Sequence, residues 1–161
     1  HPRFTLFPYT TLFRSQVCAS DGPSDHTVIG IWRARMRVLT NLMIALVALS
    51  HFGFMILEMF FWDHPLGRKI FAMTPELSSS SAALAANQGL YNGFLAAGLV
   101  WALISDRKDL KLFFLICIVV AGIFGAATAK MTILFTQALP AAIALLLVML
   151  ARKRPRDFIR G

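Results

Sequence analysis

Two ionisable side chains, His51 and Glu58, lie inside a long apolar stretch of the sequence. Because they are seven residues apart, or two helical turns, they share one face of a helix. Glu58 could be ionised and paired with Lys130, or protonated and able to carry a proton in apolar surroundings. His51 could be a general base, a proton relay or a metal ligand, but a histidine bonded to an amide is the simpler interpretation. No specific metal motif fits, so neither a metal site nor a cofactor is predicted.

Amides and a tyrosine form a second polar group, inside the run Leu84–Gly98. Asn87 with Tyr91, and Gln88 with Asn92, are each four residues apart and therefore form two neighbouring stripes on a helix. Polar side chains inside a membrane must face protein or water, because lipid cannot hydrogen-bond them. If both stripes face inward, they line a small pocket together with the acid and the imidazole.

The composition indicates what kind of element carries these groups. Of 161 residues, 57% are hydrophobic and 15% are charged, and the mean hydropathy is +0.66. This is too apolar for a soluble domain of this size and predicts an integral membrane protein. The formal charge of +8 does not indicate nucleic-acid binding, because Lys and Arg lie at the ends of apolar runs. Cys18 and Cys117 give no disulfide framework.

Four apolar segments predict an all-α, four-helix membrane bundle. They cover about residues 38–62, 81–104, 110–129 and 131–150, each near the roughly 20 residues that cross a bilayer. Ser78 to Ser81 are expected to cap the second helix. The third and fourth segments almost adjoin, which predicts a tight hairpin, and Pro140 is expected to kink the fourth helix.

The first 35 residues are treated separately. Thr5–Ser15 matches the translation of a common sequencing adapter, and a patternless polar stretch follows it. We therefore expect residues 1–35 to be a disordered, non-native leader, as in a gene from a metagenomic assembly. The alternative is a genuine flexible leader. Met36 is then the favoured start of a four-helix transmembrane domain at 36–161.

The charges predict the orientation. Positively charged short loops stay in the cytoplasm. If both termini are cytoplasmic, nine Lys and Arg residues lie inside: Arg37, Arg107, Lys108, Lys111, Arg152, Lys153, Arg154, Arg156 and Arg160. Three lie outside: Arg68, Lys69 and Lys130. This predicts a multi-pass protein of the bacterial inner membrane with both termini cytoplasmic.

In this topology the polar side chains gather in the outer half of the bundle. The expected ligand-binding residues are Glu58, His51, Asn87, Gln88, Tyr91, Asn92, Gln137 and Lys130. One interpretation is that they only join the helices, since such bonds are common and worth about 0.6 kcal/mol each. We favour a ligand site, because five or more polar groups at one depth exceed what joining helices requires. The loop Asp63–Phe71 either closes over this pocket as a lid or rests on the membrane interface, and we favour the second.

Small residues complete the pattern. Gly89 and Gly93, and Gly122 with Ala126, give faces that let helices approach closely. Packing within the bundle explains them best, although a homo-oligomer is also compatible.

At these residues the chain resembles a known family, the small bacterial and fungal membrane proteins catalogued as domain of unknown function 1304. The matching stretches are Glu58–Trp62, Ala86–Ala96, Ala121–Thr128 and Gln137–Ala141, within about Met36–Leu150. The resemblance implies a four-helix integral membrane protein and no particular activity.

The sequence thus predicts a membrane protein that binds or moves a small or lipid-like molecule at a polar pocket. Two alternatives stay open. One is a membrane enzyme that uses His51 or Glu58 in acid–base chemistry, which we consider the weaker case, and the other is an accessory subunit without a ligand. The lipid bilayer is the predicted partner, a homo-oligomer stays open, and no nucleic acid is predicted.

Overall fold

The computed structural model describes residues 25–151, and this part of the chain is all-α, as predicted. Its helices are α1 (Asp25–Phe60), α2 (Pro65–Phe71), α3 (Pro75–Ile104), α4 (Lys108–Thr128), the π-helix η1 (Leu134–Ala138) and α5 (Leu139–Leu150). Residues 1–24 and 152–161 lie outside the described part.

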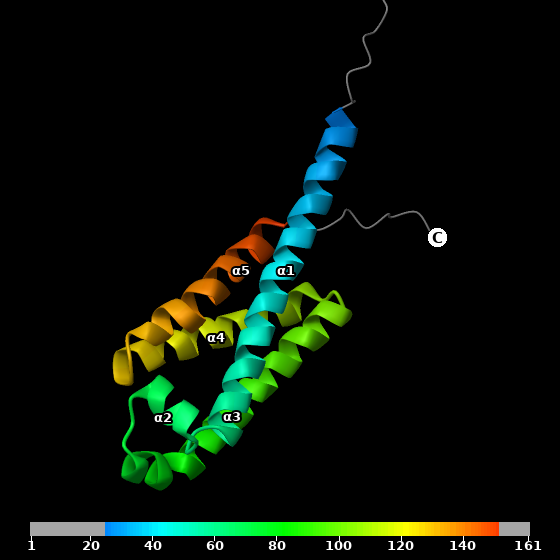
Figure 1. Ribbon diagram of the computed structural model, residues 1–161. Coiled ribbons are helices and arrows are strands. Elements are labelled where there is room, and N and C mark those ends of the chain that lie inside the picture. The colour runs from blue at the N-terminus through cyan, green and yellow to red at the C-terminus, as the bar shows by residue number, and fades with distance from the viewer. Residues whose placement is uncertain (1–24, 152–161) are drawn as a thin grey trace, which may run out of the picture.

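The helices form two antiparallel pairs (Figure 1). The long helix α1 packs along α3, and α4 packs against η1 and α5 as the predicted hairpin. The pairs contact each other near the turn between α3 and α4. At the other end the tip of the hairpin lies apart from the first turns of α3. We call these the α3–α4 end and the α2 end of the molecule.

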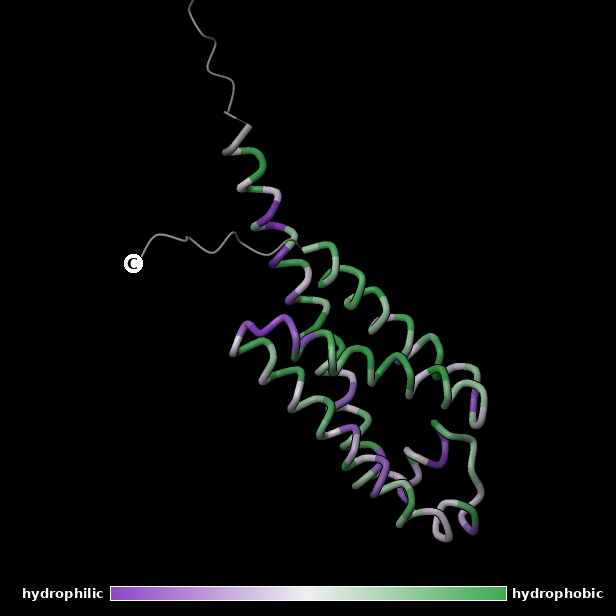
Figure 2. The backbone as a smooth tube through the Cα atoms, turned by 180° about the vertical axis from the view of Figure 1, so that it is seen from behind, coloured by the Kyte–Doolittle hydropathy of each residue, from purple (hydrophilic) through white to green (hydrophobic). Residues whose placement is uncertain are grey.

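The hydrophobic core lies toward the α3–α4 end. Its fully buried side chains come from all four long elements and include Ile44, Leu99, Leu115, Ile118 and Ala144. Elsewhere the long helices expose large apolar side chains, and the tube of α4 and α5 is hydrophobic along most of its length (Figure 2). Two helices, Thr27–Phe60 and Lys108–Thr128, are long and apolar enough to cross a membrane.

The first helix begins earlier than predicted. Residues 25–35 were expected to be disordered, but they belong to α1, which the sequence analysis began near residue 38. No proline interrupts the stretch from Thr27 to Met36, so the helix continues through it. Whether residues 1–35 are native stays a prediction, and residues 1–24 lie outside the described part.

The second apolar helix also begins earlier. Thr74 caps α3 by accepting a hydrogen bond from the amide of Leu77, with Pro75 in the first turn. The serines from Ser78 to Ser81 were predicted to be the cap, but they lie inside the helix. The additional helix α2 was expected as a loop. It raises the number of α-helices in the described part to five.

Pro140 changes the fourth apolar segment in an identifiable way. It has no N–H to donate to the carbonyl of Thr136, and its ring crowds that carbonyl. The turns just before it widen into η1, where the amide of Leu139 donates to the carbonyl of Leu134. The predicted kink is therefore a π-helical segment, and Gln137 lies within it.

Candidate functional site

Three side chains from three helices form a hydrogen-bonded chain, which we call the acid cluster: Glu58, Asn92 and Gln137. The side-chain amide of Asn92 donates to Glu58 Oε2 at 2.7 Å. The amide of Gln137 donates to Asn92 Oδ1 at a longer 3.4 Å. Asn92 is 3% exposed, whereas Glu58 and Gln137 are half-buried. The cluster thus has a buried centre and two accessible ends.

Small residues bring the backbones of this site together. A Cβ on Gly89 would lie 2.7 Å from Met59 Cγ, and one on Gly93 would lie 2.6 Å from Met55 Sδ. These contacts seat α3 against α1 and place Asn92 beside Glu58. In the hairpin, a Cβ on Gly122 would lie 2.8 Å from the backbone nitrogen of Ala138. That close approach fixes η1, and with it Gln137.

His51 lies two turns from Glu58 on the same face of α1 and is 1% exposed. Its Nδ1 is 2.9 Å from the carbonyl of Val47. Because a carbonyl only accepts, Nδ1 carries the proton and the neutral ring keeps a lone pair on Nε2. Nε2 is the one buried side-chain nitrogen or oxygen in residues 25–151 that has no hydrogen-bond partner. The predicted bond to an amide is therefore not formed.

The other predicted site residues lie outside the acid cluster. Asn87 and Gln88 are exposed, and Tyr91 is 54% exposed with its ring edge against Phe94. Gln88 precedes Asn92 by one turn, so it flanks the cluster on α3. Lys130 is exposed and makes no ion pair in the described structure, so the suggested pair with Glu58 is not formed.

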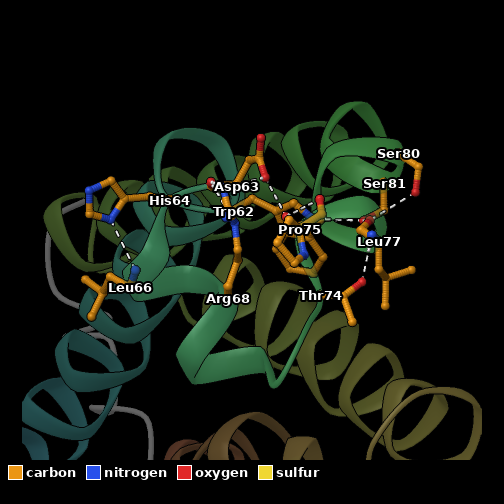
Figure 3. Close-up of polar contacts among 11 residues, drawn as sticks. Trp62, Asp63, His64, Leu66, Arg68, Thr74, Pro75, Leu77, Ser80 and Ser81 are labelled. Atoms are coloured by element: carbon orange, nitrogen blue, oxygen red, sulfur yellow. Dashed lines mark hydrogen bonds and ion pairs between the residues drawn. The ribbon is translucent and has the colours of Figure 1, made fainter.

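The predicted outer loop is organised around Asp63. Arg68 donates from Nε and Nη2 to the Asp63 carbonyl, at 3.1 and 2.6 Å (Figure 3). The hydroxyl of Ser78 donates to the Asp63 carboxylate, and Trp62 Nε1 donates to the hydroxyl of Ser81 at 3.0 Å. These two hydrogen bonds join the segment to the first turns of α3. The loop therefore folds back and is held against α3.

A second polar cluster, missed in the sequence analysis, lies at the α3–α4 end. Lys111 donates to Asp106 Oδ1 at 2.6 Å and to Asn41 Oδ1 at 3.1 Å. The lysine side chain is 7% exposed and Asp106 is 62% exposed. The hydrogen bond from Lys111 holds the pKa of Asp106 below its ordinary value. We call these three residues the lysine cluster. The sequence signal that could have revealed this cluster is a lysine just inside an apolar run, five residues after an aspartate.

An apolar groove of about 700 Å³ runs along α1 and α3. It is lined by small and large apolar side chains, among them Ala45, Phe52, Met55, Gly93 and Ala97. His51 and Glu58 do not line it. The groove is therefore separate from the acid cluster.

The arrangement defines a class of protein: an apolar helical bundle with a carboxylate and amides bonded across three helices. Sequence comparison gives the family. Proteins of unknown function designated DUF1304 match residues 45–149, and the chain belongs to this family. An uncharacterized protein, YpaA of Lactococcus lactis subsp. lactis (strain IL1403), is 35% identical over 115 residues, which are 69% of this chain and 97% of that protein. No solved structure matches.

Proposed function

We propose that this chain is a multi-pass inner-membrane protein that binds or moves a small or lipid-like molecule at the acid cluster. In this proposal α1, α3, α4 and the unit of η1 with α5 cross the bilayer, and both termini are cytoplasmic. The α2 end then faces outward and the lysine cluster faces the cytoplasm. The observation that carries the binding proposal is the carboxylate of Glu58, which has one neutral donor and no cation among the described residues.

The exposed surface supports the membrane part. Most of the apolar stretch in each candidate spanning helix is not covered by protein, with 22% and 28% of the residues buried. Leu49 and Val120 are more than 60% exposed near the middle of these helices, and Phe124 is so one turn before the end of α4. Exposure of many large apolar side chains around a bundle matches contact with lipid better than contact with water.

Labelling tests the orientation. In a background of Cys18→Ser and Cys117→Ser, Lys130→Cys should react with a membrane-impermeant maleimide in intact cells after removal of the outer membrane. Asp109→Cys, at the α3–α4 end, should react only after the inner membrane is permeabilised. The reverse pattern, or equal labelling, would contradict the proposed topology.

The hydrogen bonds that Glu58 makes support the proposal that the acid cluster binds a ligand. In the lysine cluster, the charge of Lys111 is paired with the carboxylate of Asp106. At the acid cluster, Glu58 accepts one bond from the described residues, although an ionised carboxylate can accept several. An ionisable group left in this state within apolar helices indicates function rather than packing.

Acid–base catalysis is the second candidate, and one observation favours it: the free Nε2 lone pair of His51. However, His51 and Glu58 make no hydrogen bond to each other, and His51 is 1% exposed. A general base must reach the proton that it removes, so binding or transport fits this geometry better.

Native mass spectrometry of the purified full chain tests the binding proposal. We expect a co-purifying molecule on the wild type and its loss in Glu58→Ala. Glu76→Gln is the matched control, because Glu76 is an exposed acid in the first turn of α3. A wild type that carries nothing when released from native membranes, or equal retention in all three proteins, would reject binding at the acid cluster.

A further inference from the structure

The direction of the hydrogen bonds in the acid cluster follows from its acid. An ionised carboxylate can only accept, so Asn92 must turn its NH₂ group toward Glu58. The carbonyl of Asn92 then faces Gln137, which must also present its NH₂ group. The groups left free are a carboxylate oxygen of Glu58 at one end, and the carbonyl and second N–H of Gln137 at the other. The acidic end accepts hydrogen bonds when ionised, so a ligand that binds Glu58 must donate them.

No charge in the neighbouring elements compensates Glu58. The apolar spans 77–104 of α3 and 131–150 of η1 and α5 contain no Asp, Glu, Lys or Arg. Tyr91 and His51 are the other titratable side chains on the facing parts of α3 and α1. In α2, Arg68 pairs with Asp63, and Lys69 makes no ion pair among the described residues. Lys130, at the tip of the hairpin, is exposed and makes no ion pair there either.

His51 does not serve as the counter-ion. Its Nδ1 is already bonded to the carbonyl of Val47, and Nε2 lies where no described acceptor reaches it. A doubly protonated ring would bury a cationic N–H without a partner, which is strongly unfavourable. The neutral ring, with a free lone pair, is the less costly state.

An isolated carboxylate in apolar surroundings has two ways to avoid a buried charge: it holds a proton, or it pairs with a cation. We propose that the acid cluster binds hydrophobic amines in their ammonium form, each in exchange for one proton of Glu58. The step is balanced: the carboxylic acid and the ammonium ion give an ammonium–carboxylate pair and one proton released to water. This inference rests on the proposed function and specifies its ligand class.

The geometry suits such a head group. An ammonium N–H would bond the free oxygen of Glu58, at one half-buried end of the cluster. Asn92 would keep its bond to Glu58 and hold the acid in place. A hydrophobic amine can reach the site from lipid, since large apolar side chains such as Leu84 and Leu90 are exposed on α3.

Dodecylamine is the probe, and dodecanol is its neutral analogue with the same chain. The full-length protein in nanodiscs is titrated with each compound in weak buffer, with pH and bound ligand recorded together. We expect about one proton released per amine bound, and an amine affinity that rises about tenfold per pH unit while Glu58 is protonated. Glu58→Gln should release no proton and lose most of the amine affinity, whereas Glu76→Gln should match the wild type.

The outcomes separate the two proposals. If the wild type binds dodecanol as tightly as the amine, or binds the amine with no proton release and no dependence on pH, the amine inference fails while binding at the site stands. If neither compound binds and no molecule co-purifies, both fail. The pH series uses the wild type alone, so it decides the matter even if Glu58→Gln does not fold.

Discussion

Both polar clusters of this protein bond an ionisable side chain to an amide, but only the lysine cluster contains an ion pair. In the lysine cluster, the buried ammonium of Lys111 contacts a carboxylate and an amide oxygen. In the acid cluster, the carboxylate of Glu58 contacts one neutral amide. The clusters lie about 26 Å apart along α1, measured from Asn41 to Glu58. Because Lys111 is paired with a carboxylate at one end of the molecule, the absence of a described cation beside Glu58 at the other end is a specific property of the acid cluster.

The comparison gives a rule for the roles of the two clusters. A buried charge with its partners contributes to stability, and removing a partner is costly. A carboxyl group that lacks a counter-ion contributes no ion pair to stability and is available to a ligand. Substitutions at the α3–α4 end should therefore change stability and leave binding intact, and substitutions of Glu58 should do the reverse.

The largest expected effect concerns the framework that holds Gln137 in the acid cluster. Gly122→Leu should lower the free energy of unfolding by about 3 kcal/mol, because its side chain meets the backbone of η1 at Ala138. Gly53→Leu is the control: it has nothing within 4 Å of an added Cβ and the same gain in helix propensity. Thermal unfolding in detergent, followed by circular dichroism, should separate the two variants. Equal melting temperatures would contradict the close α4–η1 contact.

Asp106→Asn tests the lysine cluster and should cost about 1–2 kcal/mol, because Lys111 stays buried with a weaker partner. Asparagine also tolerates the left-handed backbone at this position, where φ is 45°. The control is Asp109→Asn. Asp109 forms a salt bridge with Arg107, and both side chains are more than half exposed, so this substitution should leave stability nearly unchanged. A larger loss from Asp109→Asn than from Asp106→Asn would reverse our assignment.

The pH dependence of the same cluster is a smaller effect. Hydrogen bonding to Lys111 lowers the pKa of Asp106 below its ordinary value of 3.8. A depressed pKa contributes stability that is present above the ordinary value and is lost as the pH falls toward the lowered one. The melting-temperature difference between wild type and Asp106→Asn should therefore shrink below about pH 4. A difference in melting temperature that grows as the pH falls would show that the pKa of Asp106 is not lowered in the folded protein.

The smallest expected effect on stability belongs to Glu58→Gln. Glutamine can still accept the hydrogen bond from Asn92, and no counter-ion loses its partner. The free energy of unfolding should stay within about 1 kcal/mol of the wild type. A loss of 3 kcal/mol or more, typical of a broken buried ion pair, would mean that Glu58 has a cationic partner after all.

The apolar runs of the sequence predicted the helices well, because long hydrophobic stretches have few other uses. The positions of Glu58, Asn92 and Gln137 as polar residues inside those runs also marked the acid cluster. The family assignment made from the sequence is confirmed by the match to residues 45–149.

The remaining features depend on tertiary packing. Successive residues of a helix are rotated by about 100°, so neighbours can face inward and outward. Tyr91 is 54% exposed, whereas Asn92, the next residue, is 3% exposed. The sequence alone does not decide which of them faces α1. Lys111 was counted in the sequence analysis only as one of the cytoplasmic positive charges, and the structure shows its side chain to be 7% exposed. The attachment of the segment before α2 to α3 depends on Asp63 meeting Ser78, a contact that no local pattern reveals.

The central claim is that the two clusters have separate roles, and native mass spectrometry of three proteins tests it most directly. Wild type, Glu58→Gln and Asp106→Asn are released from native membranes and scanned for a bound molecule. We expect the molecule on the wild type and on Asp106→Asn, despite its lower stability, and not on Glu58→Gln. Retention by Glu58→Gln, or loss from the folded Asp106→Asn protein, would contradict the account.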